Sequence, residues 1–393
     1  MRSAVITHAL RTPIGRFMGV FSSLKARDLG IAVTKGLIEK SGISPDQVDE
    51  FIFGNARQAG SGPNIARQIA VFSGIPDKVP AYTVNKACAS GLKSIILAAQ
   101  AIWLNEAEII IAGGTESMTN VPFMVDGLRH GVKLGDIKFD DGMYRDGFLC
   151  PMAGQVMGRT AENLVEKYSI SRLEQDEYAA MSQQKCQRAR NEGRFSDEIV
   201  PVTVKGRRGE ETVISQDEHP RDNVTVEKLS KLSPVFKEGG SVHAGNSSGI
   251  TDGASALLIM SAEKARRMGY KPMAEIGSYS VAGVDPGIMG IGPVPAIKEL
   301  LKKTGMKLED FDLIELNEAF AAQILACHRE LFLPMDRVNV NGGAIALGHP
   351  IGATGARIVT TLLHEMTKRG AENGMAALCV SGGLGMAVHF KRD

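Results

Sequence analysis

Two stretches of the sequence share a pattern and decide the fold: LIEKSGISPDQVDEFIFGNA (residues 37–56) and LLKKTGMKLEDFDLIELNEA (residues 300–319). Five of the twenty aligned positions are identical, and each stretch contains a helix end, a glycine break, a short acidic segment and an apolar strand. A loop, a glycine-rich helix and a further strand follow in both cases, so the loop with Cys88 corresponds to the loop with His349. The repeat predicts two similar α/β halves that meet about a pseudo-twofold axis.

Short apolar runs that end in glycine continue this pattern outside the repeat. Residues 109–112 run into Gly113-Gly114, and residues 376–380 run into Ser381-Gly382-Gly383, as is typical of buried strands. Apolar residues at i, i+3, i+4 and i+7 spacing predict helices within 92–103 and 356–366. Because strands alternate with helices, we expect an α/β fold with a largely parallel sheet.

The segment between the halves has a different character, with charged helices and hairpin-like pieces. Ser171 and Glu174 form a capping-box pattern that opens a long polar helix. We expect an N-terminal half (1–118 plus 250–270), an inserted loop domain (119–249) and a C-terminal half (271–393). Such an insertion is typical of a lid or substrate subdomain, and a surface decoration is the alternative.

Composition excludes several classes of protein. The chain has 393 residues, with 45 Lys plus Arg against 44 Asp plus Glu, a balance that argues against a nucleic-acid partner. Its five cysteines show no CxxC pair, so we expect neither a disulfide scaffold nor a metal site. The first residues show no signal-peptide pattern, and the apolar runs are too short to span a bilayer. We therefore expect a cytoplasmic protein without a membrane partner.

Cys88 is the first candidate catalytic residue, in the stretch NKACASG (85–91) directly before a predicted helix. A cysteine there lies near the positive end of the helix dipole, which favours the thiolate, and its small neighbours leave room for a substrate. The alternative is a buried structural cysteine.

His349 is the second candidate, in the glycine-rich stretch NGGAIALGHPIGATG (341–355). The stretch lacks both the GK[ST] ending of a phosphate-binding loop and the spacing of a dinucleotide fingerprint. Pro350 fixes the local backbone and would hold His349 out of its loop. A glycine-rich connector with an incidental histidine is the alternative.

Two further candidates stand where apolar strands end: Cys379, and Asn317 in the run NEAF. A core cysteine and a helix-capping asparagine are the ordinary interpretations of such positions. However, Cys88, His349, Cys379 and Asn317 all lie at strand ends or helix starts, where parallel α/β sheets place their sites. We therefore treat the four as one set.

The motifs around these residues resemble those of the thiolase family. They are NKACASGLKS around Cys88, NEAF from Asn317, GGAIALGHPIGATGAR around His349 and CVSGGLGMA from Cys379. The stretches GGTESM (113–118), MGRTAEN (157–163) and HAGNSSGITDGA (243–254) are similar too, so the resemblance spans nearly the whole chain. It implies a thiolase fold with two βαβαβαββ halves in a five-layered αβαβα arrangement, and a loop domain that holds coenzyme A.

The resemblance also implies a role for each residue in a ping-pong thioester exchange. Cys88 would be the acylated nucleophile, and His349 would take its proton and help to bind the thioester oxygen. Cys379 would move the substrate α-proton and protonate the departing thiolate. Asn317 would hold a water that, with His349, stabilises the enolate oxygen. The backbone N–H groups of Cys88 and Ser381 would form a second oxyanion hole.

Two departures from the family pattern concern the pocket. Ser381 stands where many members have a glycine, and a positive φ would be costly there. Val156 stands where many short-chain members have a histidine, which affects pocket shape. Matching positions also make Arg221, Ser248 and Phe320 candidate coenzyme A contacts.

Within the family, the motif TVNKACASGLKS (83–94) favours the short-chain branch. That branch joins two acetyl-CoA reversibly into acetoacetyl-CoA and CoA through an acetyl-cysteine. A broader 3-ketoacyl-CoA thiolase of fatty-acid β-oxidation, a decarboxylating ketosynthase and an inactive scaffold are the alternatives. The resemblance further implies a transferase of lipid metabolism that needs no cofactor and forms a homo-oligomer, either a dimer or a homotetramer.

Overall fold

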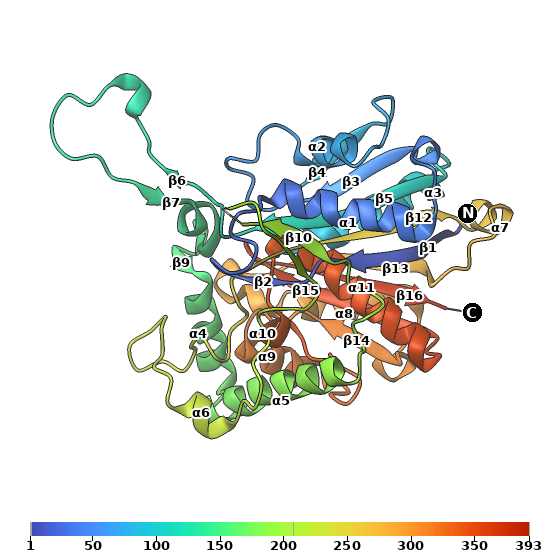
Figure 1. Ribbon diagram of the computed structural model, residues 1–393. Helices are drawn as coiled ribbons and strands as arrows, with labels where there is room; N and C mark the ends of the chain where they lie inside the picture. The colour runs from blue at the N-terminus through green and yellow to red at the C-terminus, as the bar shows by residue number, and fades with distance from the viewer. Residues whose placement is uncertain (1, 207, 393) are drawn as a thin grey trace.

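The computed structural model describes residues 2–206 and 208–392, and its body consists of two halves with the same order of elements (Figure 1). The N-terminal half contains β1 (Ala4–Arg11), α1 (Ala26–Ser41), β3 (Glu50–Gly54), α2 (Ile65–Phe72), β4 (Ala81–Val84), α3 (Ser90–Trp103), β5 (Ile109–Ser117) and β12 (Thr251–Ser261). The C-terminal half contains β13 (Ala274–Gly283), α8 (Pro293–Thr304), β14 (Leu313–Leu316), α9 (Ala321–Leu331), α10 (Ala344–Leu347), α11 (Ile351–Arg369), β15 (Asn373–Val380) and β16 (Leu384–Lys391).

Both halves have the same strand order. It is β4-β3-β5-β12-β1 in the N-terminal half and β14-β15-β16-β13 in the C-terminal half. A single bridge between Val338 and Ile314 stands beside β14, where the first half has β4. Antiparallel pairing of β1 with β13 joins the two sheets. The predicted pair of similar halves is confirmed.

The expectation of a largely parallel sheet is wrong. Strands linked through helices are parallel, namely β3 with β4 and β5, and β14 with β15. The pairs β1–β12, β5–β12, β13–β16 and β15–β16 are antiparallel. A tight turn over residues 381–383 reverses the chain between β15 and β16, and a hairpin always leaves its strands antiparallel. The expectation was based on the strands that are linked through helices, and it did not include the strands that pair after a reversal of the chain.

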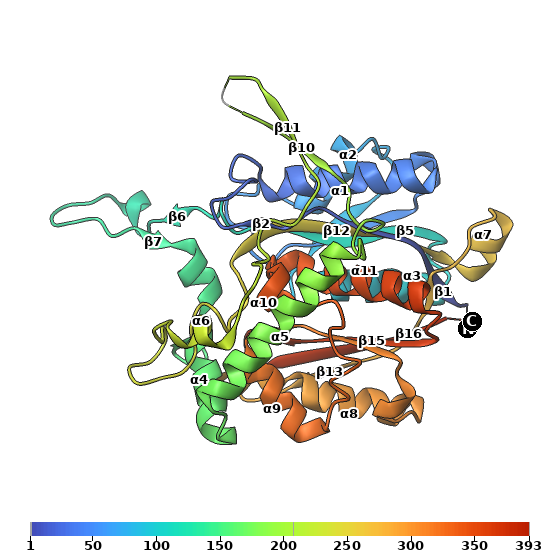
Figure 2. The same ribbon diagram turned by 60° about the horizontal axis from the view of Figure 1, so that its bottom comes forward.

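The elements stack in five layers (Figures 1 and 2). Helices α1 and α2 cover the outer face of one sheet, α8 and α9 cover the outer face of the other, and α3 and α11 lie between the sheets. The largest apolar cluster accordingly combines residues of α3 and α11 with strand residues from both halves, such as Ile110 and Leu378. The αβαβα arrangement is confirmed.

The two central helices approach each other through glycines. A Cβ atom at Gly91 of α3 would lie 2.7 Å from the backbone nitrogen of Ala356, and one at Gly355 of α11 would lie 2.3 Å from that of Leu92. Real Cβ atoms do not come so close, so only glycine allows this helix spacing. The contact lies at the first turns of both helices, and it therefore brings the preceding loops, with Cys88 and His349, to the same place.

The sequence repeat is visible in the backbone. Gly42 ends α1 with φ 67° and Gly305 ends α8 with φ 70°, the left-handed conformation of a glycine cap. Asp49 and Asp312, at matching positions of the repeat, each accept hydrogen bonds from two consecutive backbone N–H groups, which belong to Glu108 and Ile109 and to Glu372 and Asn373 respectively.

Residues 118–250 are inserted between β5 and β12, in the position where the C-terminal half has its tight turn. They contain β6 (Phe123–Met124), β7 (Asp140–Asp141), β8 (Leu149–Cys150), β9 (Gln155–Val156), α4 (Met157–Tyr168), α5 (Arg172–Asn191), β10 (Val202–Lys205), β11 (Glu211–Ile214) and α6 (Val226–Ser230). The predicted capping box opens α5, because Ser171 N donates to Glu174 Oε2 (2.7 Å) and Glu174 N to Ser171 Oγ (3.2 Å). Both views show the β6–β7 arm projecting from the body.

A buried ion pair ties the insertion to the first strand. Arg11 of β1 donates from Nε to Glu198 Oε1 and from Nη1 to Asp217 Oδ1, both at 2.6 Å, and its side chain is fully buried. Breaking such a pair on one side typically costs about 3–5 kcal/mol, so the anchor is strong. No helix within residues 2–206 and 208–392 is long and apolar enough to cross a membrane.

Candidate active site

Cys88 lies in a strained turn between β4 and α3. The preceding Ala87 has φ 46°, which is unfavourable for a residue with a side chain. Neighbouring groups hold this turn: Ala87 N donates to Asn85 Oδ1 (3.0 Å), and Ser90 Oγ donates to the Ala87 carbonyl (2.6 Å). Cys88 follows this strained residue, is partly buried, and precedes α3 by two residues.

Burial and neighbouring donors have opposite effects on the pKa of the Cys88 thiol. Burial raises its pKa, whereas the backbone N–H of Ser381, the Arg57 guanidinium and the N–H of Cys88 itself lower it. These are the two N–H groups that the resemblance implies for an oxyanion hole, and both favour the ionised form of this thiol. Ser381 does not have a positive φ, because Gly382 (φ 89°) and Gly383 (φ 82°) take that conformation in the turn. The serine at this position therefore causes no backbone strain.

His349 is held by its own helix. Its Nδ1 lies 2.7 Å from Thr354 Oγ1, and the Thr354 hydroxyl donates to the Pro350 carbonyl at 2.9 Å. Because that hydroxyl hydrogen is already used, Thr354 accepts from Nδ1–H, which leaves Nε2 free to take a proton. Burial, followed by the charges of Arg357 and Arg57, lowers the pKa of His349 to about 3. The imidazole is thus a neutral proton acceptor.

Cys379 lies near the end of β15, two residues before Ser381, and is almost fully buried. Burial raises its pKa well above the usual value, and the charge of Cys88 raises it further. Ile351, two residues after His349, belongs to the apolar cluster that contacts Cys88, so the His349 segment lies beside the Cys88 turn. Cys379 packs in a separate cluster with Met157, Ala319 and Phe320.

Asn317 lies after β14 and does not cap a helix. Its backbone N–H donates to the Ala377 carbonyl (2.9 Å), two residues before Cys379, and Phe320 is the residue at the start of α9. The residue is 1% exposed, and within residues 2–206 and 208–392 neither its Oδ1 nor its Nδ2 has a hydrogen-bond partner. A buried amide without partners is costly, so we infer that a water or ligand occupies this position.

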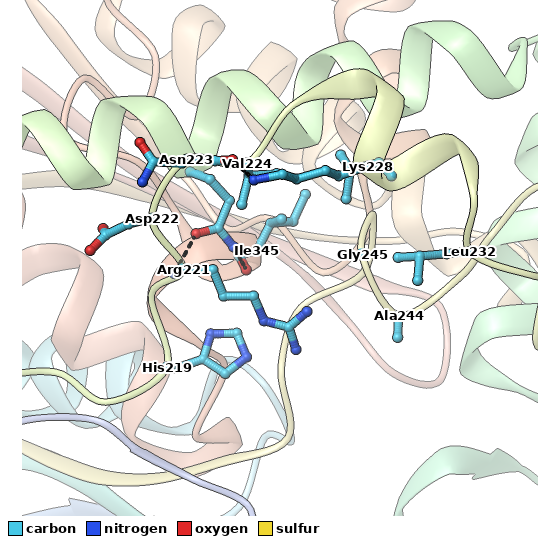
Figure 3. A pocket seen from close by; sticks show the side chains of 12 residues that line it. His219, Arg221, Asp222, Asn223, Val224, Lys228, Leu232, Ala244, Gly245 and Ile345 are labelled. Atoms are coloured by element: carbon cyan, nitrogen blue, oxygen red, sulfur yellow. Dashed lines mark hydrogen bonds between the residues drawn. The ribbon is translucent and has the colours of Figure 1, made fainter.

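A pocket of about 240 Å³ opens between the insertion and the C-terminal half (Figure 3). It is lined by Gln183, His219, Arg221, Asp222, Asn223, Val224, Lys228, Leu229, Leu232, Ala244, Gly245 and Ile345. The predicted Arg221 is among them. Ser248 and Phe320 are not: Ser248 N donates to the Ala319 carbonyl (2.9 Å), and Phe320 packs in the apolar cluster with Cys379.

Sequence reasoning missed His219 and the remaining lining residues. His219 Nδ1 lies 2.7 Å from the Ala346 carbonyl of α10, and its pKa is lowered chiefly by burial. The segment from His219 to Leu232 shows no periodicity, so only its place in the insertion and its mixture of basic and apolar residues could have identified it. Within residues 2–206 and 208–392, no group of three or more His, Cys, Asp or Glu side chains could hold a metal ion.

Comparisons with known proteins agree with this arrangement. The model of the thiolase N-terminal domain matches residues 4–263, and that of the thiolase C-terminal domain matches residues 270–392. The chain is 52% identical to an acetyl-CoA acetyltransferase of Pseudomonas aeruginosa over 393 residues, which cover both proteins completely.

Solved structures show the same similarity. The acetyl-CoA acetyltransferase of Bacillus anthracis superposes with a TM-score of 0.97 at 47% identity, over 100% of this chain and 99% of that one. Human mitochondrial 3-ketoacyl-CoA thiolase in complex with CoA superposes with a TM-score of 0.96 at 43% identity, over 100% and 98%. The chain belongs to the thiolase family. It is accordingly an acyltransferase.

Proposed function

We propose that this protein is an acetyl-CoA C-acetyltransferase that condenses two acetyl-CoA into acetoacetyl-CoA and CoA, reversibly. The main support is the place of Cys88 in the turn before α3, against the apolar cluster that contains Ile351 of the His349 segment, together with a second buried thiol, Cys379, near the end of β15. The similarity to the Pseudomonas aeruginosa acetyl-CoA acetyltransferase supports the same substrate.

In the first half-reaction, His349 Nε2 takes the thiol proton of Cys88 while the sulfur attacks the acetyl carbonyl carbon. The oxyanion is stabilised by oriented donors, each worth about 2.7–4 kcal/mol in comparable sites. When the carbon–sulfur bond to CoA breaks, Cys379 gives its proton to the departing thiolate. The products are acetyl-Cys88, protonated His349, ionised Cys379 and free CoA.

In the second half-reaction, the Cys379 thiolate takes an α-proton from a second acetyl-CoA. A thioester enolate is a poor anion in water, and a water held by Asn317 together with His349 stabilises its oxygen. The enolate carbon attacks acetyl-Cys88, a carbon–carbon bond forms, and the Cys88 sulfur leaves. Protonated His349 returns the proton to it. The cycle is balanced and requires neither a metal nor a redox cofactor.

The neutral state of His349 predicts a flat pH profile for acylation. Since the pKa of His349 is lowered from 6.5 to about 3, the imidazole stays unprotonated as the pH falls from about 8 to about 5. We expect the rate of Cys88 acylation, measured by rapid quench with acetyl-CoA, to change little over this range. A loss of rate with a midpoint near 6.5 would show that His349 is not a buried neutral base. Circular dichroism at each pH controls for unfolding.

We assign the coenzyme A moiety to the pocket in Figure 3. Arg221 and Lys228 can meet phosphate groups, and Leu229 and Leu232 supply an apolar surface. Phe320, in the apolar cluster with Cys379, and Ser248, whose backbone N–H donates to the Ala319 carbonyl, would contact the thioester arm. The human mitochondrial thiolase whose structure contains CoA supports a CoA thioester as substrate.

The proposal includes a homo-oligomer, a dimer or a homotetramer, in the cytoplasm and in lipid metabolism. The β6–β7 arm supports an oligomer, because Phe123, Leu128, Leu134 and Phe139 on it are more than half exposed. Exposed apolar groups on a projecting segment are typical of a surface that another subunit covers.

The closest alternative is a broader 3-ketoacyl-CoA thiolase, since the similar human structure has that name. Met118, Met143 and Phe148 pack with Ile351 against Cys88 and limit the room for an acyl chain. We therefore expect faster cleavage of acetoacetyl-CoA than of 3-ketohexadecanoyl-CoA. Met143→Ala should raise the relative rate on the longer substrate. Met306→Ala, which changes a methionine outside this cluster, should leave the ratio unchanged. Faster cleavage of the long substrate by the unaltered protein would reverse the assignment.

A decarboxylating ketosynthase is the less favoured alternative. That class pairs its cysteine with two histidines, whereas Cys379 stands at the second position here. Turnover of malonyl-ACP would favour it.

A further inference from the structure

The loop that carries His349 contains only one short helix, α10 (Ala344–Leu347), and is otherwise irregular. It runs from Asn341 to Pro350 between the Val338 bridge and α11, and it contains Gly342, Gly343 and Gly348. Glycine has the largest conformational freedom to lose, so such a segment needs outside contacts to hold one side chain in place. A general base must be positioned within hydrogen-bond reach of the proton that it takes.

Glu318 holds the loop on the side of the C-terminal half. Its side chain is fully buried, and Oε2 accepts from the backbone N–H of Ile345 (3.0 Å) and from Ser182 Oγ (2.7 Å). Oε1 accepts from Tyr178 Oη (2.8 Å) and Asn339 Nδ2 (3.0 Å). Ile345 precedes His349 by four residues, so this carboxylate fixes the beginning of the loop.

Glu116 holds the other end from the N-terminal half. Its side chain is also fully buried, and Oε2 accepts from the backbone N–H groups of Gly352 (2.8 Å) and Ala56 (3.1 Å). Oε1 accepts from Asn55 Nδ2 (2.8 Å) and from the backbone N–H of Arg57 (3.2 Å). Gly352 follows His349 by three residues and lies at the start of α11. This carboxylate therefore joins the two halves beside the site.

We propose that Glu116 and Glu318 are positioning residues that hold the His349 loop at both ends and thereby place the imidazole against Cys88. Neither carboxylate has a part in the proton transfers, and each acts through His349. The expected effect on the reaction rate rests on the proposed acyl transfer. The expected effect on the mobility of the loop does not depend on which substrate the protein uses.

Glutamine is an informative replacement at both positions because it keeps the shape and removes acceptor capacity. Each oxygen of Glu116 accepts from at least one backbone N–H, so a glutamine NH₂ group would face a backbone donor in either orientation. At position 318 the NH₂ group would face either the Ile345 N–H or Asn339 Nδ2. Charge-assisted hydrogen bonds are about twice as strong as neutral ones. The replacement therefore weakens the hold on the loop although it leaves no cavity.

Hydrogen–deuterium exchange tests the mechanical part. In Glu116→Gln and in Glu318→Gln, we expect amides between residues 341 and 355 to exchange at least about tenfold faster, while β1 and β12 remain protected. Asp312→Asn is the matched control, because Asp312 also accepts from two backbone N–H groups but at the far end of the sheet. Unchanged exchange in this segment in both glutamine variants would overturn the proposal, whatever the substrate.

A double-mutant cycle with His349→Ala tests the kinetic part. We expect each glutamine variant to lower kcat by roughly tenfold to hundredfold with KM changed little, since a displacement of about 1 Å can cost that much. In the His349→Ala background the same substitution should lower the residual rate by less than about twofold, because its effect acts through the missing imidazole. Equal losses in both backgrounds would mean that the carboxylates act elsewhere and would overturn the proposal.

Two further measurements distinguish a failure of the positioning proposal from a failure of the proposed function and from misfolding of a variant. Activity of the unaltered protein on acetoacetyl-CoA reports on the proposed function alone. If Glu318→Gln does not fold, Tyr178→Phe removes a single donor to the same carboxylate without removing a contact to the loop itself, and it should accelerate exchange at Ile345 to a smaller extent. No acceleration there would count against Glu318.

Discussion

Cys88→Ala is expected to gain no acetyl group on exposure to acetyl-CoA, whereas the unaltered protein gains one. The backbone N–H groups of Ser381 and of Cys88 itself lower the pKa of the thiol at position 88, against the effect of burial, and so favour its thiolate. Without this nucleophile no acyl-enzyme forms, so the two thioesters would have to react with each other in a single, more difficult step. Condensation should fall by at least roughly 10⁴-fold. Intact-mass analysis and steady-state rates measure both effects.

Cys186→Ala is the matched control for this prediction. Cys186 is a fully buried thiol on α5, and burial raises its pKa to about 12. Its variant should keep the acetyl adduct, and peptide mapping should place the adduct on Cys88. An adduct that persists in Cys88→Ala would refute the assigned nucleophile, and the absence of any adduct in the unaltered protein would favour an inactive scaffold.

Cys379→Ala is expected to separate the two half-reactions. Cys379 has no part in the attack of Cys88 on the thioester carbonyl, so acetyl-Cys88 should still form, although CoA departs without its proton donor. The α-proton of the second substrate then has no thiolate to take it, since Asn317 cannot ionise and the lowered pKa of His349 makes its imidazole a weak base. Condensation should fall by roughly 10²–10⁴-fold, the usual contribution of a general acid–base group. Mass analysis follows the first step and steady-state rates follow the second.

The control is Cys327→Ala, another buried cysteine of the C-terminal half. Its thiol donates to the Gly290 carbonyl (3.4 Å), and burial raises its pKa to about 12. This variant should retain both half-reactions. If Cys379→Ala lost acylation and condensation to the same extent, the division of roles between the two cysteines would be wrong.

The fold was largely predictable because its signals are local. The glycines that end α1 and α8, the apolar periodicity of α3 and α11 and the capping box of α5 each depend on neighbouring residues in the sequence. Strand direction was less predictable. The chain reverses between β15 and β16 through a turn of only three residues, which is hard to recognise in a sequence. The equivalent reversal between β5 and β12 is interrupted by the insertion of residues 118–250.

For the candidate site, the sequence singled out Cys88, His349, Cys379 and Asn317, because cysteine, histidine and asparagine stand out at strand ends and in glycine-rich loops. It did not identify Glu116 and Glu318, although both lie inside motifs that had been singled out. A glutamate in a sequence resembles a solvated surface residue, and only the four donors around each carboxylate show otherwise.

The sequence by itself determined which segments become helices and strands, that the chain repeats, and which side chains could do chemistry. Only the tertiary structure decided that Ser381 comes near Cys88, that the Asn317 amide has no hydrogen-bond partner among the described residues, and that Glu116 reaches Gly352 across 236 residues. The physical reason is that secondary structure follows from neighbours along the chain. These contacts depend instead on how closely α3 and α11 pack, which glycines at Gly91 and Gly355 permit.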